Sequence, residues 1–270
     1  MAPGRRLHLS MLHRLLQAWQ DRRERRQLAR HAIPDALWAL TLARYPFIAR
    51  RSSADLSTLR RLSSLFLARK EFHGAGGFEV SDEVAVAVAA QACLPVLALG
   101  LEVYDGFVGI VMHESQVRAT REFMDEDGVV HHYEEELAGE AMEGGPLMLA
   151  WSELQPDPAL GAGPVYNVVI HEFAHVLDMS NGAIDGIPAL PSAEATQAWI
   201  EVIDPAWEQF CERVEAGEDT LIDPYGVESV DEFFAVASEA FFVEAVRMRQ
   251  EHPALYALFT SYYRQDPAAG

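Results

Sequence analysis

The sequence contains only two cysteines among its 270 residues, Cys93 and Cys211. Two thiols so far apart suggest neither a disulfide framework nor a thiolate metal site, and they fit a reducing compartment. The N-terminus also lacks a long apolar segment followed by a small-residue cleavage site, which argues against a secretory signal peptide. We therefore expect a cytoplasmic protein.

Long uncharged runs are almost absent as well. One stretch, residues 84–101, has no charged side chain over 18 residues, which is about the minimum length for crossing a bilayer. It is rich in alanine and is interrupted by Gln91, Pro95 and Gly100. These features favour a buried helix that ends near Pro95, and we expect no membrane span.

Basic residues are scarce after residue 70. Residues 1–70 carry 15 Lys/Arg and 4 Asp/Glu, whereas residues 71–270 carry 6 and 37. The acidic part would repel a phosphate backbone, so we expect no direct binding to nucleic acid. The basic start could attract an acidic partner or an anionic surface, or it could be a solvated helix face. We predict a basic helical arm over residues 1–32, followed by one domain over residues 33–270.

Hydrophobic periodicity predicts helices through most of the chain. They cover about residues 7–30, 34–46, 82–95, 164–179, 199–214 (interrupted at Asp204-Pro205) and 231–249, with others starting at 55 and 253. Short apolar runs predict strands at 78–80, 103–104, 107–112 and 147–151. An acidic variable insertion at about 122–143, with nine acids and no Lys or Arg, is expected to be a solvated hairpin or a flexible segment. The fold class is thus α+β, mainly helical with a small mixed sheet.

One stretch, Val168–Asp178, carries a pattern typical of zinc peptidases. His171 and His175 lie four residues apart, so on a helix both imidazoles can reach one metal ion. Glu172 then lies beside the metal, where it can hold a water and accept its proton during attack on a carbonyl. Such enzymes commonly bind substrate as an extra strand along a sheet edge. The run at 147–151 is a candidate for that edge, and an ordinary core strand is the alternative.

Catalytic zinc needs a third protein ligand. A third histidine six residues after His175 is excluded, because position 181 is Asn. The helix predicted at 231–249 offers Glu232 and Glu239, which lie seven residues apart on one face. Spacing does not choose between them, and an arginine partner or a water-exposed position would also explain these acids. Asp178, seven residues after His171, could orient an imidazole, cap the helix or face water.

Several segments together resemble a known family. They are His171-Glu172-Phe173-Ala174-His175 with Asp178, Asp185-Gly186-Ile187-Pro188, Asp223 with Tyr225, Glu232-Phe233-Phe234-Ala235-Val236 with Ser238 and Glu239, and Tyr262-Tyr263-Arg264-Gln265-Asp266-Pro267. This combination resembles the Mlc titration factor A family of bacterial zinc metallopeptidases, whose zincin-like catalytic core is similar to that of anthrax lethal factor. The similarity extends over roughly residues 33–267.

The resemblance implies specific roles for these residues. His171, His175 and Glu232 would bind Zn2+, and Glu172 would be the general base. Tyr225 would lie near the metal and could donate a hydrogen bond to the oxyanion. Glu239 would support the site or contact the substrate amine.

The family also implies a cytoplasmic aminopeptidase active on short peptides and associated with the glucose-responsive repressor Mlc. Two alternatives remain open. One is a repressor-binding module in which the zinc site is regulatory or structural. The other is an endoprotease with one protein substrate.

Overall fold

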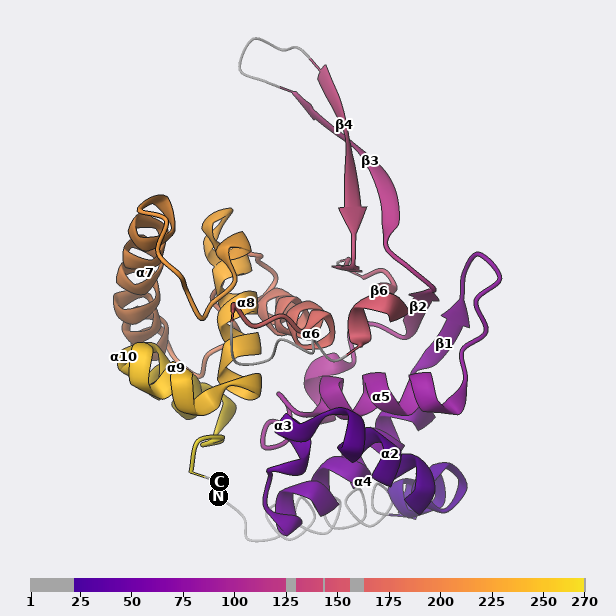
Figure 1. Ribbon diagram of the computed structural model, residues 1–270. Coiled ribbons are helices and arrows are strands. Elements are labelled where there is room, and N and C mark those ends of the chain that lie inside the picture. The colour runs from indigo at the N-terminus through magenta and orange to yellow at the C-terminus, as the bar shows by residue number, and fades with distance from the viewer. Residues whose placement is uncertain (1–21, 125–129, 143, 156–162, 270) are drawn as a thin grey trace, which may run out of the picture.

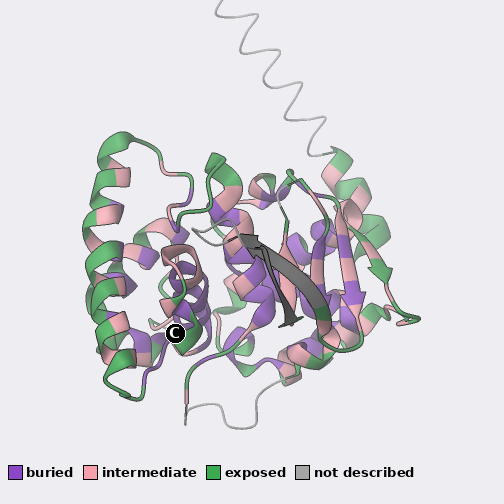
Figure 2. Ribbon diagram, turned by 90° about the horizontal axis from the view of Figure 1, so that it is seen from above, coloured by how far each residue is buried: buried purple, intermediate pink, exposed green. Residues whose placement is uncertain are grey.

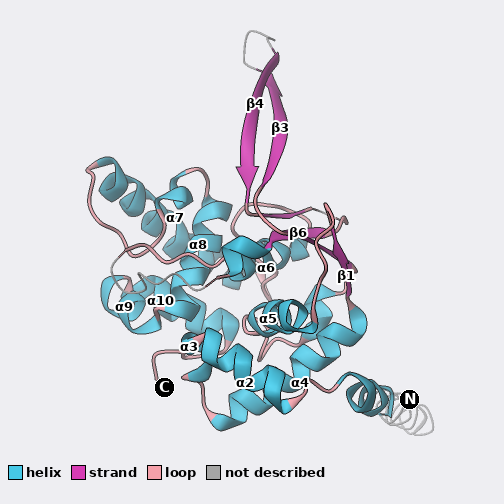
Figure 3. Cartoon of the chain, turned by 45° about the vertical axis from the view of Figure 1, so that its right-hand side comes forward, coloured by secondary structure: helices cyan, strands magenta, loops and turns pink. Residues whose placement is uncertain are grey.

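The computed structural model describes residues 22–124, 130–142, 144–155 and 163–269. Within these ranges the chain forms helices around a small mixed sheet, and a long hairpin extends from the body (Figures 1 and 3). The predicted α+β class, mainly helical with a small mixed sheet, is therefore confirmed. Part of the predicted basic arm, residues 1–21, lies outside the described residues, and residues 22–31 are helical.

The first helices are α2 (Asp35–Arg44), α3 (Pro46–Ala49), α4 (Ser53–Arg69) and α5 (Asp82–Cys93). Ser52 and Ser81 begin α4 and α5, because their hydroxyl groups accept backbone N–H groups of the first turn. Helix α5 is buried almost throughout and ends before Pro95, as the sequence predicted. Among the described residues, we find no helix with the length and hydropathy needed to cross a membrane.

The sheet has the strand order β1 (Glu71–Gly74), β2 (Gly109–His113), β6 (Leu147–Ala150) and β5 (Gly139–Ala141). The first three strands are parallel, and β5 is antiparallel to β6. The predicted strand at 147–151 therefore lies inside the sheet, followed by the 3-10 helix η2 (Trp151–Leu154). The candidate edge is therefore not at 147–151, and the alternative of an ordinary core strand is confirmed. The edge strand next to β6 is β5, which lies within a short acidic segment.

Two other predicted strands were also wrong. Residues 78–80 have no regular structure, and residues 101–104 form the 3-10 helix η1 (Leu101–Tyr104). Tyr104 turns into the core, where its hydroxyl donates to Ala92 O at 2.9 Å and its ring lies 4.9 Å from that of Phe173. Strand β1 was missed because it is short and largely exposed, and pairing with β2 defines it.

The projecting hairpin consists of β3 (Val117–Met124) and β4 (Val130–Leu137), paired antiparallel (Figure 1). Of the two structures considered for the acidic insertion at 122–143, the hairpin is the one observed, although it begins earlier, at Val117. Residues 125–129 and 143 lie outside the described residues. Strand β4 is followed after one residue by β5, so the hairpin and the edge strand are consecutive in the chain.

The second half of the chain is helical. It forms α6 (Val168–Asp178), η3 (Met179–Asn181), α7 (Ala193–Glu215), η4 (Pro224–Val227), α8 (Val230–Val243), α9 (Ala245–Glu251) and α10 (Pro253–Tyr263). The expected interruption at Pro205 is not observed, because Trp199 and Phe210 bury one continuous face of α7 on either side of it. Helix α6 lies between the sheet and α8 (Figure 1). Buried residues are concentrated in the middle of the molecule, and exposed residues cover its outer helices (Figure 2).

Candidate metal centre

Helix α6 starts at a side-chain cap. Asn167 Oδ1 accepts the N–H of Ile170 at 2.9 Å, and Asn167 Nδ2 donates to Gln91 Oε1 at 2.7 Å. The helix therefore begins at Val168 rather than at Pro164, the start predicted from the sequence. On its buried face, the Phe173 ring packs between aromatic rings of the core. This anchoring leaves the opposite face, with both histidines, directed toward α8.

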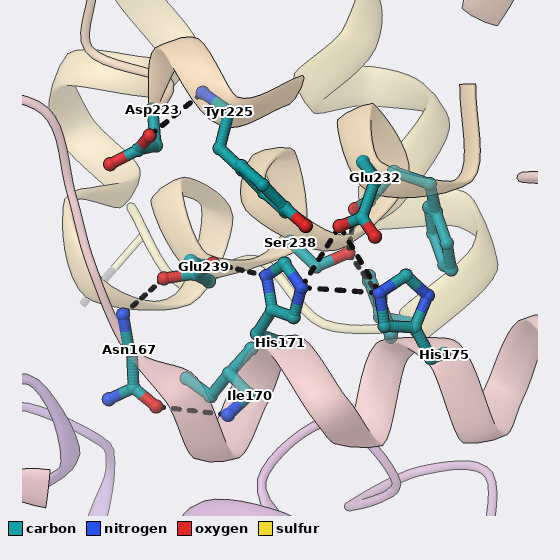
Figure 4. Close-up of polar contacts among 11 residues, drawn as sticks. Asn167, Ile170, His171, His175, Asp223, Tyr225, Glu232, Ser238 and Glu239 are labelled. Atoms are coloured by element: carbon teal, nitrogen blue, oxygen red, sulfur yellow. Dashed lines mark hydrogen bonds and ion pairs between the residues drawn. The ribbon is translucent and has the colours of Figure 1, made fainter. Parts of the chain in front are cut away.

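The two imidazoles meet one carboxylate from α8 (Figure 4). His171 Nε2 and His175 Nε2 are 3.2 Å apart, and Glu232 Oε2 lies 3.1 Å from the first and 3.4 Å from the second. Glu232 is held in the first turn of α8 by a cap, because Ser229 Oγ accepts its backbone N–H at 3.4 Å. Three potential ligand atoms therefore form a nearly equilateral triangle.

This triangle fits a tetrahedral metal ion. Bonds of about 2.0–2.1 Å at a tetrahedral angle separate two ligand atoms by about 3.4 Å, close to all three observed distances. Glu232 Oε2 is buried, and its described polar contacts are the ion pairs with the two imidazoles, so a cation shared by the three residues would satisfy it. One potential ligand atom from each of His171, His175 and Glu232 lies within 4.8 Å of the other two. The donor set therefore suits a metal ion with one position left for water.

Glu239 lies behind His171. Its side chain is fully buried, with Oε1 2.9 Å from His171 Nδ1, and its other oxygen accepts the backbone N–H of Asn167. An ionised carboxylate only accepts hydrogen bonds, so ionised Glu239 favours the tautomer with a proton on His171 Nδ1 and leaves the Nε2 lone pair for a metal ion. The seven-residue spacing did not distinguish Glu232 from Glu239 as the metal ligand. In the structure Glu232 lies at Nε2 of His171 and Glu239 lies at Nδ1 of the same ring.

Electrostatics in this cluster favour a cation. Burial opposes ionisation of Glu232, but its contacts with the two imidazoles outweigh burial and lower its pKa to about 2. Burial also lowers the pKa of His171, yet contacts with Glu232 and Glu239 raise it well above its ordinary value. The acidic surroundings thus hold a positive charge at this point. A metal ion would take the place of the second imidazole proton.

Glu172 is packed against the sheet edge. The residue is 5% exposed, and burial raises its pKa to about 7. Gly139 of β5 lies directly against it, since a Cβ atom there would be 2.4 Å from Glu172 Oε1. Glu172 also lines one cleft together with His171, His175 and Glu232. Strand β5 and α6 thereby fix the carboxylate beside the triangle.

Tyr225 approaches from η4. The N–H of Tyr225 donates to Asp223 Oδ1 at 2.9 Å, which fixes the turn. The Tyr225 ring centroid is 6.2 Å from that of His171, and its hydroxyl is directed toward Glu232 (Figure 4). The side chain lines the cleft and stays half exposed. A residue that follows a proline in a turn is thus brought to the candidate site.

Asp178 occupies a different position from the one expected for an imidazole-orienting residue. It is fully buried, and its Oδ2 accepts the backbone N–H groups of Asp185 and Gly186, both at 3.0 Å. These bonds brace the turn after η3 (Met179–Asn181), where Gly182 adopts a positive φ of 91°. Asp178 therefore holds a loop against the end of α6, and its side chain caps no helix through these bonds.

Sequence reasoning missed two residues that shape the site. Asn167 forms hydrogen bonds with Gln91 of α5, Ile170 of α6 and Glu239 of α8. Asparagine is a preferred N-cap residue, so its place just before the apolar helix could have predicted the start of α6. Gly139 gave no signal, because only the packing of β5 against α6 requires a residue without a side chain.

Comparisons with known proteins agree with this geometry. The family model of the glucose-regulated metallo-peptidase M90 matches residues 18–264. An uncharacterised protein from Synechocystis is 35% identical over 92% of this chain and 90% of its own length. Mlc titration factor A from Enterobacter is 34% identical over 87% of the chain and 88% of its own length. Mlc titration factor A from Pectobacterium atrosepticum is 32% identical over 83% and 84%.

Proposed function

Because the chain belongs to the glucose-regulated metallo-peptidase M90 family, we propose that it is a zinc-dependent peptidase with aminopeptidase character. His171, His175 and Glu232 would hold the zinc ion, and Glu172 would be the general base. The observation that carries this proposal is the triangle of two Nε2 atoms and one carboxylate oxygen, with separations of 3.1–3.4 Å. Its dimensions match tetrahedral zinc with one open position.

Each residue of the cleft then has a chemical task. Zinc, when bound, polarises a carbonyl and lowers the pKa of the attacking water. Glu172 accepts the proton of that water and delivers it to the leaving amine, a role suited to a carboxyl whose pKa lies near 7. Tyr225 donates a hydrogen bond from its hydroxyl group to the oxygen that gains negative charge. Glu239 keeps His171 in the tautomer and orientation that bind the metal.

Aminopeptidase character is supported by further acids in the cleft. Glu140 and Asp231 line it beside the candidate metal ligands. A peptide with a free amine would bring an ammonium group into this negative region, where opposite charge stabilises it. Comparing cleavage of free and N-acetylated versions of one peptide tests this assignment. Equal cleavage of both versions would instead support an endoprotease.

The substitution Glu172→Gln tests the mechanism. The amide keeps the shape of the side chain but accepts no proton, so hydrolysis should be lost while zinc content stays unchanged. Glu208→Gln, an exposed position on α7, is the matched control and should retain full activity. Metal analysis and peptide cleavage are measured on the same preparations. Hydrolysis by zinc-loaded Glu172→Gln protein at the unmodified rate would refute the proposed role of Glu172.

A regulatory function is the second candidate. It is favoured by the relatives named Mlc titration factor A, and a repressor of the Mlc type would be the partner. Binding of such a repressor to the Glu172→Gln protein would separate titration from peptide cleavage. Two free cysteines suit a reducing compartment, which supports a cytoplasmic location for either activity.

A further inference from the structure

A second hollow adjoins the metal cleft. The apolar recess is lined by residues from η1 and the loop after it, from β5 and the turn that follows, and from the end of α6. They are Val103, Gly106, Phe107, Ala141, Met142, Gly144, Gly145, Leu147, Val176, Met179 and Ser180. The roles proposed above for the metal ligands, Glu172 and Tyr225 leave this recess without a function.

The recess and the metal cleft are neighbours that share two lining residues. Ala141 and Met179 line both hollows. Val176, on the recess side, directly follows His175 on α6. A substrate held at the metal therefore lies next to the recess.

The chemistry of the two hollows is opposite. The metal cleft is lined by histidines and several carboxylates, whereas none of the described residues that line the recess is charged. The one hydroxyl, on Ser180, already donates to Leu177 O and accepts the N–H of Ala189. A charged side chain would lose its hydration there without gaining a partner. An apolar side chain would gain by leaving water.

The chain direction of β5 indicates which substrate residue lies beside the recess. Strand β5 starts at Gly139, against Glu172, and runs toward Ala141 and the recess. A peptide added antiparallel to this edge, the more stable pairing, runs in the opposite direction. Its residues on the recess side therefore precede the bond that is cleaved.

We propose that the apolar recess binds the side chain of the residue that supplies the scissile carbonyl, and that it selects large apolar side chains such as leucine and phenylalanine. For an aminopeptidase this is the N-terminal residue. The inference rests on the proposed function for the direction of the substrate. The physical feature that carries it is the recess, uncharged in its described lining, that adjoins the metal cleft at Ala141 and Met179.

Binding can be measured without turnover. Zinc-loaded Glu172→Gln protein is titrated calorimetrically with tripeptides X-Ala-Ala, where X is Leu, Phe, Ala or Asp. The Leu and Phe peptides should bind at least about tenfold more tightly than the Ala peptide, the range expected from a few buried methylene groups. The Asp peptide should bind most weakly. Equal affinity for all four peptides, or no binding of any, would overturn the assignment.

Substitutions in the same background locate the effect. Val103→Phe fills the recess at its η1 end, and Met142→Asp places a charge on its exposed rim, where the fold tolerates it. Each should reduce the preference for Leu over Ala by about tenfold. Val246→Phe, on an exposed position of α9, is the matched control and should leave the preference unchanged. An unchanged preference in folded Val103→Phe and Met142→Asp proteins would refute the recess as the binding site.

The two proposals can fail separately. Leu-selective binding together with no hydrolysis of any peptide by zinc-loaded protein with Glu172 intact would refute the proposed peptidase and leave the recess assignment standing. Hydrolysis of free-amine peptides without a preference for large apolar residues would refute only the recess assignment.

Discussion

The substitution Gly139→Ala tests how the sheet edge positions Glu172. The added Cβ would lie 2.4 Å from Oε1, 2.6 Å from Cγ and 2.7 Å from Cδ of Glu172. Ordinary contact requires about 3.5 Å, so the carboxylate must move by about 1 Å. Rotation of the carboxylate about its Cγ–Cδ bond leaves Cγ and Cδ in place, so the side chain has to move further back along its length.

Two effects of different size should follow. Overpacking of this kind costs about 1–3 kcal/mol of stability. A displacement of about 1 Å at a catalytic group costs on the order of 100-fold in rate. Zinc content should not change, because Glu172 is not among the three proposed ligands. We therefore expect a folded, zinc-loaded protein with about 1% of the kcat/KM for a free-amine peptide.

A double-mutant cycle makes the test specific. Glu172→Asp shortens the side chain and frees the space that the added methyl group would occupy, so it should cost less activity in the Gly139→Ala protein than in the unmodified one. Gly163→Ala is the matched control, since a Cβ there meets nothing within 4 Å. Full activity of folded Gly139→Ala protein, or additive effects in the cycle, would refute the argument that β5 positions the base.

Three further predictions concern the surroundings of the site. Glu232→Ala should abolish zinc binding in a competition assay with a chromogenic chelator, whereas Glu239→Ala should weaken it about 10–100-fold; full zinc retention by Glu232→Ala would contradict the ligand set. Burial raises the pKa of Asp178 from 3.8 to about 6, so this carboxyl stabilises the folded protein below pH 4 and that contribution, up to about 3 kcal/mol, is lost as pH rises through 6. Urea unfolding of Asp178→Asn should therefore depend less on pH between 4 and 6, and identical slopes for both proteins would contradict this. Gly186→Ala, at a φ of 75° and with a Cβ 2.7 Å from Val230 O, should lower the unfolding free energy by about 1–3 kcal/mol, and an unchanged melting temperature would show that this contact relaxes freely.

Local sequence signals predicted much of the helical framework. Apolar periodicity is such a signal, and in the structure the ends of these helices are set by contacts only a few residues long, such as the serine caps before α4 and α5. Strand prediction was less successful. The segment that contains Tyr104 is a 3-10 helix whose tyrosine is buried in the core, and the exposed strand β1 is defined only by its pairing with β2. Strand formation depends on partners distant in sequence, which periodicity alone does not identify.

At the metal centre, too, some features follow from local sequence and others only from tertiary packing. The sequence by itself determined that His171 and His175 share one helix face with Glu172 beside them, because a spacing of four residues is one helical turn. It did not separate Glu232 from Glu239, since seven residues also return to the same face. Only the position of α8 against α6 puts Glu232 Oε2 at the two Nε2 atoms and Glu239 behind His171. Likewise, only the packing of β5 against α6 put Gly139 beside Glu172, because such contacts join segments whose spacing in the chain carries no information about their distance in space.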